Sequence, residues 1–383
     1  MKNIRFFFCL LVSVVTSAAF GQSSIRGNIA SSLKETMQQK HNQSTKLVIK
    51  KLEKKSATGK VVKEDTIYFR DVVRKYGWME GLGEPITLAM AHHLPYYYRM
   101  SMKNGVGHWQ HVEAMHGDTM TTRHPIGTYI IDKGQNDDVL ANKEWVELLN
   151  TVTQWVFTTN FEGDEVYEER SYDKDNNMVY SYSAIRNQDG RMTGCYNDAW
   201  GRPADMREDS TTTYGSVVCI TYDRHGCDSI IDYLDGQGLR KFNNNGVDQT
   251  RYSYDENGYV LTAMSCNCVG DRIHDNWGNC GFTTTYDHQK GLRSTIYRNK
   301  EWEPMRMPAT RAGIEQTFIR CDYRQDQWGR DSVATILTAD GRPDATFAGI
   351  HQIHYKYGDD GILILKTYYD INFNVLEPKR LHQ

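Results

Sequence analysis

The sequence lacks the short motifs that mark several common enzyme classes. Its 383 residues contain no nucleophile elbow, no Walker loop, no dinucleotide-binding fingerprint and no His-Glu-x-x-His segment. Beyond its N-terminal segment, it also lacks an apolar run long enough to cross a bilayer, which requires about 20 residues. These absences argue against the activities that those motifs mark. The sequence therefore says more about architecture and export than about chemistry.

The N-terminus has the three parts of a secretory signal peptide. Lys2 and Arg5 supply positive charge, residues 6–15 form an uncharged apolar run, and Ala19 and Gly21 place small residues at a cleavage site. The sequence predicts removal of residues 1–21 by cleavage after Gly21, which makes the protein secreted or periplasmic and leaves it without membrane insertion. An uncleaved anchor is the alternative, but the apolar run is short for a span of about 20 residues.

The charge balance disfavours nucleic acid and anionic membranes as partners. Loss of Lys2 and Arg5 removes two positive charges and changes the formal net charge from −3 to −5. Residues 22–65 depart from this balance, because a predicted helix at 28–41 is followed by a Lys-rich stretch at 46–63. We interpret that stretch as a solvated linker; a docking strip for an acidic partner is the alternative.

Residues 66–165 are predicted to form a small α+β module. Strand-forming residues at 96–102 and 109–115 flank a turn with Asn-Gly, which indicates a β-hairpin. Residues 143–150 indicate a helix, because Trp145, Leu148 and Leu149 recur at helical spacing. No cofactor is expected.

From Tyr172 onward the sequence repeats one element, a Tyr followed by Asp or another polar residue, a short turn and a strand. Asp and Asn bond their own backbone in turns and Gly supplies a positive φ, so each element predicts a chain reversal. Stacked hairpins bury a shared face that one hairpin cannot bury alone. Residues 166–383 are therefore predicted to be mainly β, an array of antiparallel β-hairpin repeats. The copies begin at Tyr172, Tyr222, Tyr254, Tyr286, Tyr323 and Tyr357, at intervals of 50, 32, 32, 37 and 34 residues.

Two of these copies carry a resemblance to a known family. Residues 222–226, Tyr-Asp-Arg-His-Gly, and residues 252–260 resemble the core of the YD repeat of RHS-type proteins. The resemblance covers about half the chain, and it implies an extended or curved β-sheet on an exported protein. The family's repeats are shorter and far more numerous, and the few copies here are not enough for its cargo-enclosing shells. The whole chain is also similar to secreted hairpin-repeat proteins of gut-type bacteria.

A group of histidines and carboxylates in the N-terminal module is the candidate for catalysis. Imidazole and carboxylate groups serve as ligands and as proton carriers. If residues 109–116 form a strand, His111 and Glu113 share one face and His116 lies on the other. We therefore expect no metal site, and His92, His111, Glu113 and His116 define only the alternative function, an extracytoplasmic hydrolase.

Cysteines and tryptophans give two further candidate sets. Cys266, Cys268 and Cys280 miss the paired spacing of zinc ribbons, so disulfide bonding among them is the favoured interpretation in an exported chain. Tryptophans at or near predicted turns could stack on sugars or grip peptides; the alternative is that they cap the repeat core. These are Trp200, Trp277, Trp302 and Trp328.

The sequence thus predicts an exported, non-catalytic β-repeat protein. Its expected role is to offer a binding or scaffolding surface to a glycan or a protein partner.

Overall fold

A computed structural model describes residues 65–102, 111–125, 143–159, 166–207, 213–214, 216–243, 245–276, 278–308 and 316–376. All of them belong to one compact unit, Lys63–Gln383. The predicted signal peptide, the helix at 28–41 and the Lys-rich stretch lie outside the described residues. Within these residues, no helix has the length and apolar character needed to cross a membrane.

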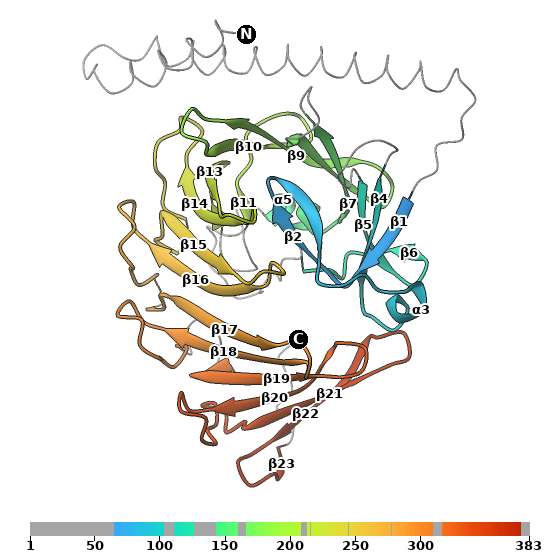
Figure 1. Ribbon diagram of the computed structural model, residues 1–383, viewed down its shortest axis with the longest axis vertical. Helices are drawn as coiled ribbons and strands as arrows, with labels where there is room; N and C mark the ends of the chain where they lie inside the picture. Colours follow the sequence, from blue (N-terminus) through green and yellow to red (C-terminus); the bar gives the residue numbers. More distant parts are fainter. Residues whose placement is uncertain are drawn as a thin grey trace, which may run out of the picture. The chain divides into compact units, whose positions relative to one another are not determined.

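One antiparallel sheet of 19 strands dominates the unit (Figure 1). Its first part runs through seven strands and a short β6 (Thr119–Met120) beside β5. In order of pairing, the seven are β1 (Asp65–Phe69), β4 (Tyr97–Met102), β5 (His111–His116), β7 (Val152–Thr159), β8 (Val166–Asp173), β9 (Met178–Arg186) and β10 (Met192–Asp198).

The sheet continues without a break into five hairpins and a short last strand. Each strand pairs with the next one along the chain, so the predicted fold class, a mainly β array of antiparallel hairpins, is confirmed. The strands are β13 (Val217–Tyr222), β14 (Asp228–Leu234), β15 (Gln249–Tyr254), β16 (Val260–Cys266), β17 (Gly281–Asp287), β18 (Leu292–Arg298), β19 (Arg320–Gln325), β20 (Asp331–Leu337), β21 (Gln352–Tyr357), β22 (Leu363–Tyr369) and β23 (Val375–Leu376).

Smaller elements accompany the sheet. The hairpin of β2 (Asp71–Lys75) and β3 (Trp78–Leu82) turns through Tyr76 and Gly77, both with positive φ, as a two-residue hairpin turn requires. The helix α3 (Leu88–Ala91) follows it, and α5 (Lys143–Leu149) forms where the helical spacing of Trp145, Leu148 and Leu149 predicts. A separate pair, β11 (Met206–Arg207) and β12 (Thr213–Tyr214), completes the elements.

The repeat hairpins are closed by short turns, and in three of the five an Asp carboxylate accepts hydrogen bonds from two turn N–H groups. Asp255 Oδ1 accepts hydrogen bonds from the backbone N–H groups of Asn257 and Tyr259, both at 2.9 Å, and Gly258 adopts a φ of +95°. Asp223 repeats this arrangement one hairpin earlier. We call these closures the Tyr-Asp turns; they form because a short carboxylate can satisfy two turn N–H groups that face no strand.

The repeated tyrosines occupy equivalent positions. The hydroxyl of Tyr254 donates to Asp228 O (2.8 Å), that of Tyr286 to Val260 O (3.2 Å), and that of Tyr357 to Asp331 O (2.8 Å). In each case the acceptor opens the preceding hairpin's second strand and lies 26 residues earlier. The periodicity read from the sequence therefore corresponds to a structural repeat.

The copy assigned to Tyr323 is wrong. The strand irregularity that immediately precedes Tyr222, Tyr254 and Tyr357 falls just before Gln325 in this unit, and Asp326 stabilises the turn. Gln325 thus replaces the tyrosine, and the intervals become 39 residues from Tyr286 and 32 to Tyr357. The longer unit carries its extra residues between Met307 and Phe318, which share a backbone hydrogen bond of 3.0 Å.

The core is concentrated in the first part of the sheet. The largest buried cluster joins Trp78 and Met79 of the β2–β3 hairpin to Tyr98, Trp155 and other residues of the strands around it, so that the sheet curves about this hairpin (Figure 1). Two smaller clusters lie around Leu94 and Tyr97 and, in the later hairpins, around Cys321 and Ile336. Burial of large aromatic side chains of this kind contributes on the order of 1.5–3 kcal/mol each.

Candidate functional site

Residues 70–94, which we call the strap, run along the row of Tyr-Asp turns. The strap begins with the β2–β3 hairpin, whose tip docks on the first of these turns. Tyr76 N donates to Gly226 O at 2.8 Å, and the Tyr76 ring packs edge-on against Tyr222 at 5.2 Å. Lys75 also forms an isolated bridge with Cys227. The tip is therefore fixed to the turn by backbone as well as side-chain contacts.

The middle of the strap meets the second turn. A Cβ placed on Gly258 would lie 3.2 Å from Val73, and one placed on Gly83 would lie 2.6 Å from the hydroxyl of Tyr259. Both glycines have positive φ, so they combine the required backbone conformation with room for the opposing chain.

The end of the strap meets the last two turns. The His93 ring stacks on Trp328 with centroids 4.0 Å apart, and its backbone carbonyl accepts a hydrogen bond from Arg330 Nη1 at 2.9 Å. His93 Nδ1 also lies 3.0 Å from Asp359 O in the following turn. One short segment thus contacts turns that lie roughly 150 to 270 residues further along the chain.

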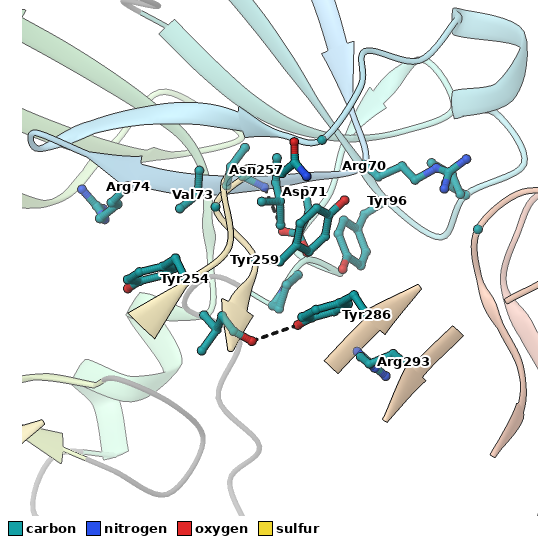
Figure 2. Close-up of a pocket in the computed structure, with 18 of the residues that line it drawn as sticks. Arg70, Asp71, Val73, Arg74, Tyr96, Tyr254, Asn257, Tyr259, Tyr286 and Arg293 are labelled. Carbon is teal, nitrogen blue, oxygen red and sulfur yellow. Dashed lines mark hydrogen bonds between the residues drawn. The ribbon is translucent and has the colours of Figure 1, made fainter. Parts of the chain in front are cut away.

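Between the strap and the hairpins lies a cavity of about 1170 Å³ (Figure 2). Its wall is rich in tyrosine and in charged groups, from the strap on one side and from strands β7, β9, β10 and β13 to β21 on the other. Figure 2 shows Tyr259 and Tyr96 close to Asp71, with Tyr286 and Arg293 beside them. The cavity also reaches Arg74 and Asp228.

One end of the cavity centres on Asp71. Burial raises the pKa of Asp71 to about 6, although a hydrogen bond from Val72 N and the nearby Arg293 guanidinium oppose the rise. Arg293 Nη2 in turn bonds Asp331 at 2.9 Å, and burial raises the pKa of Asp331 as well. Two carboxylates therefore share one guanidinium, which leaves part of the negative charge without a counter-ion at neutral pH.

The other end centres on Asp228, the first residue of β14. Burial raises the pKa of Asp228 to about 7, against the lowering effect of Arg74. Arg74 is itself occupied, since its guanidinium bonds both oxygens of the buried Glu169 at 2.5 and 2.9 Å. Within the described residues, Asp228 Oδ1 has no hydrogen-bond partner. A buried oxygen in this state is costly unless a ligand or water bonds it.

The two carboxylate centres have different charged neighbours. Arg293 acts on Asp71, whereas Arg74, Asp223 and Glu169 act on Asp228. The cavity can hydrogen-bond a ligand at both ends, but these observations do not make the two carboxyls a coupled acid–base pair.

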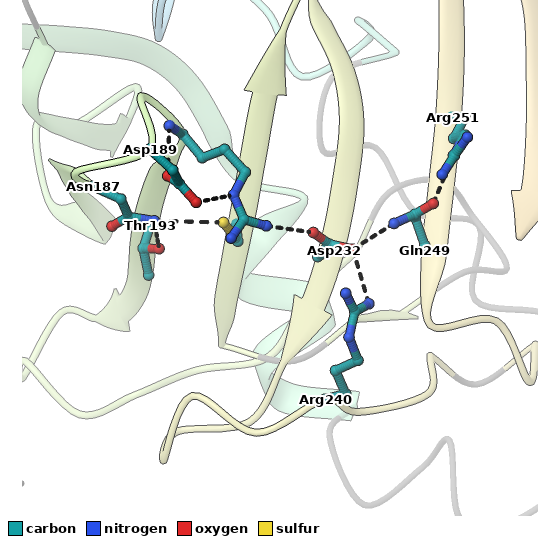
Figure 3. A network of polar contacts seen from close by, with 9 residues as sticks. Asn187, Asp189, Thr193, Asp232, Arg240, Gln249 and Arg251 are labelled. Atoms are coloured by element: carbon teal, nitrogen blue, oxygen red, sulfur yellow. Dashed lines mark hydrogen bonds and ion pairs between the residues drawn. The ribbon is translucent and has the colours of Figure 1, made fainter. Parts of the chain in front are cut away.

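A second polar network lies away from the cavity and is internally satisfied (Figure 3). The buried Asp232 accepts from Arg240 (2.9 Å) and from Gln249 Nε2 (2.7 Å), and Arg191 lies 3.4 Å away. Gln249 Oε1 accepts from Arg251 at 2.7 Å. Because Asp232 is matched by two guanidinium groups and an amide, we assign this network to the joining of successive hairpins.

The histidine and glutamate residues predicted as a hydrolase site do not converge. Glu113 forms a two-point ion pair with Arg99, and His111 Nε2 lies 3.0 Å from Gln154 Oε1 on the same face of the sheet. His116 lies on the opposite face of β5, and His92 faces Asp118 at 3.4 Å. In the part of the chain that the structure describes, no three His, Cys, Asp or Glu residues are grouped to hold a metal ion.

The candidate tryptophans lie at different ends of the hairpins. Trp200 is 73% exposed and lies beside Arg202, and Trp302 lies beside Arg272, both at the end remote from the strap. Trp328 belongs to a Tyr-Asp turn, and its ring stacks on His93. Trp277 lies outside the described residues. The three described tryptophans therefore do not form one binding platform.

The candidate disulfide cysteines are unpaired in the structure. Cys266 and Cys280 are buried, and Cys268 is exposed. Cys280 lies next to Ser265, whose backbone N–H donates to Cys280 O at 2.7 Å. Pairing of these thiols in an oxidising compartment stays a prediction.

Sequence reasoning missed the carboxylates of the cavity. Asp71 and Asp228 belong to no motif, and only folding brings the strap to the hairpins. One signal was present in the sequence: Asp228 stands 26 residues before Tyr254, at the position whose carbonyl that tyrosine bonds.

Comparison with known proteins gives little further information. No family model matches the chain, and no curated protein matches it. Among solved structures, the chain is similar to a chain in the crystal structure of TcdB2-TccC3-Cdc42, at 13% identity and a TM-score of 0.18, over 71% of this chain and 16% of that one. A structure of TcdB2-TccC3 without its hypervariable C-terminal region gives 14%, 0.19, 72% and 16%. This likeness is too weak to carry an argument about function.

Proposed function

We propose that this chain is an exported, non-catalytic binding protein that holds a hydroxyl-rich ligand, a glycan segment, in the strap cavity. The observation that carries the proposal is the wall of that cavity. Tyrosine rings stand there beside buried carboxyl and guanidinium groups, and Asp228 Oδ1 lacks a partner among the described residues. Sugars need both kinds of surface, an aromatic face for their C–H groups and polar atoms for their hydroxyls.

The size and charge of the cavity favour a neutral ligand larger than one ring. Its volume of about 1170 Å³ exceeds the usual range for small-molecule pockets, roughly 300–1,000 Å³. Carboxyl and guanidinium groups of both signs line it, so neither a strongly anionic nor a strongly cationic molecule matches the whole wall. Hydroxyl groups can donate to Asp71 and Asp228 and accept from arginine.

A non-catalytic role is supported by the separation of the two carboxyl centres. Glycoside hydrolysis uses two carboxyl groups that flank one bond and lie about 5–10 Å apart. One is protonated and acts as the acid, and the other is ionised and acts as the base or nucleophile. Asp71 lies under the influence of Arg293 and Asp228 under that of Arg74, so different cations surround the two carboxyls. In the alternative hydrolase site, His111 and Glu113 lie on one face of β5, His116 lies on the other, and His92 follows α3.

The proposal includes the predicted export and the family resemblance. Cleavage after Gly21 would deliver the protein to the periplasm or the medium, where glycans and other proteins are the available partners. We further propose that the hairpins are a long variant of the YD repeat, because Tyr, Asp and Gly keep their spacing at Tyr222 and Tyr254.

A glycan array probed with residues 22–383 tests the proposal, followed by calorimetry with the selected oligosaccharide. Asp228→Asn keeps the size of the side chain and should weaken binding by tenfold or more. Trp200→Ala, an exposed change outside the cavity, should leave the affinity unchanged. Loss of binding in the Trp200 variant alone would move the site to the outer turns. Release of reducing sugar during incubation would replace binding by hydrolysis.

A further inference from the structure

The outer edge of β22 corresponds to a strand edge that is paired in each of the four earlier hairpins. In the earlier hairpins, the second strand is paired on its outer edge with the first strand of the next hairpin, as β14 with β15, β16 with β17, β18 with β19 and β20 with β21. On β20 the paired residues are Val333, Ala334 and Thr335. The corresponding residues of β22, 32 positions later, are Leu365, Lys366 and Thr367.

These residues have no outer partner within the described chain. β22 pairs with β21 on its inner edge, and on its outer edge it pairs only at Tyr368 and Tyr369, with β23. The backbone of residues 363–367 therefore faces outward along one edge. Exposed edges of this kind recruit further strands unless charge or proline blocks them.

The side chains at this edge are apolar and exposed. Ile364 is 63% exposed, Leu365 is 52% and Leu363 is 38%, whereas the corresponding residues of β20, Asp331, Ser332 and Val333, are half-buried. Lys366 supplies the one charge in the segment Leu-Ile-Leu-Lys-Thr. The contrast shows what covering by a neighbouring strand does for the same positions in an interior hairpin.

We propose that the β22 edge is a homodimer interface in which the β22 strands of two copies pair antiparallel about a twofold axis. A twofold axis brings an identical strand alongside in the antiparallel sense, which every strand pair in this sheet uses. A head-to-tail contact would require a hairpin whose first strand has a free inner edge. The inner edges of these first strands are already paired, in β13, β15, β17, β19 and β21.

The side chains select the register. A pairing centred on Lys366 would place two ammonium groups directly opposite each other, which is unfavourable. A pairing centred on Leu365 sets Leu365 opposite its copy, Ile364 opposite Lys366 and Leu363 opposite Thr367. The second register buries the apolar groups and lets each lysine extend to solvent, so it is the one we assign.

Sedimentation of residues 22–383 over a range of concentrations tests the dimer. We expect a reversible dimer that Leu365→Lys converts to a monomer, with self-association weakened at least tenfold. Val269→Lys is the matched control, because Val269 is 74% exposed in a turn away from this edge, and it should dimerise as the unmodified protein does. A monomer at all concentrations, or a dimer unaffected by Leu365→Lys, would overturn the proposal.

Cross-linking tests the register independently of stability. In a Cys268→Ser background, oxidation by copper phenanthroline should join Leu365→Cys copies into a covalent dimer much faster than Lys366→Cys copies. Equal rates for the two variants would contradict the assigned register. A monomer that binds an added extended peptide at β22 would show a strand from another protein to be the occupant and would also overturn the dimer.

Discussion

The two ends of the repeat hairpins have the same turn chemistry but different surroundings. At the Tyr-Asp end, Asp255 bonds two turn N–H groups and Gly258 has positive φ. At the opposite end, Asp235 bonds the N–H groups of Gln237 and Leu239 in the same way, and Gly238 has positive φ. Only the first end is covered by the strap. Local sequence therefore determines the turn, and a distant segment determines which turns help to form a cavity.

The open end tolerates residues that the covered end does not contain. Trp302 and Phe373 adopt φ values of +69° and +61° where the corresponding turns have Gly238, Gly270 or Gly341. The left-handed conformation costs such residues on the order of 1–2 kcal/mol. The strap does not reach this end, and Phe373 there is 61% exposed.

The largest effect should come from adding a methyl group to a covered turn. A Cβ on Gly361 would lie 2.4 Å from the His93 carbonyl oxygen, at a φ of +79°. Gly361→Ala combines strain with a backbone clash and should lower the free energy of unfolding by about 3–5 kcal/mol. The control is Gly238→Ala, where nothing lies within 4 Å, and it should cost about 1–2 kcal/mol. Urea denaturation measures both, and equal losses would show that the strap does not contact this turn.

A pH-dependent effect should follow for Asp228. Its folded-state pKa of about 7 lies above the ordinary value of 3.8, so its contribution to stability is complete below about pH 4 and is lost as the pH rises through 7. At about 1.4 kcal/mol per pKa unit, the loss has an upper bound of about 4 kcal/mol. Asp228→Asn should reduce this loss and flatten the stability profile between pH 4 and 7.

Asp340→Asn serves as the control: hydrogen bonds from Thr338 and Arg342 lower the pKa of this exposed carboxyl, so its loss should leave the profile between pH 4 and 7 unchanged. Two results would each contradict the burial of the Asp228 carboxyl. One is a wild-type stability that rises from pH 5 to 8, and the other is an Asp228→Asn variant with the same profile as the wild type. Asp71, with a pKa of about 6, should contribute in the same direction over pH 4 to 6.

The smallest effect contrasts two tryptophans. Trp328→Ala removes the stack on His93 at a covered turn and should cost about 2 kcal/mol. Trp302→Gly, in a turn at the end remote from the strap, places glycine at a position with positive φ. It should change the free energy of unfolding by less than about 1 kcal/mol. Thermal unfolding of the two variants checks the order, which would be reversed if the outer turns carried the packing.

The sequence predicted what depends on neighbours along the chain. The hairpins, the turn residues and the helix of Trp145 follow from local patterns, and the division of His111 and Glu113 from His116 follows from strand alternation. The unit at Gln325 was missed because the assignment relied on tyrosine, whereas Asp326 and Gly329 suffice for the turn. The strap and the cavity depend on contacts between distant segments, which no spacing in the sequence records.

The covering of one end by the strap is tested most directly by hydrogen exchange at matched turn amides. Gly258 N donates to Asp255 O at 3.1 Å and Gly238 N donates to Asp235 O at 2.9 Å, so the local hydrogen bonds are alike. If the strap lies on the Tyr-Asp turns, the Gly258 amide should exchange far more slowly than that of Gly238. Equal exchange rates at the two glycines would contradict this account of the fold and of its cavity.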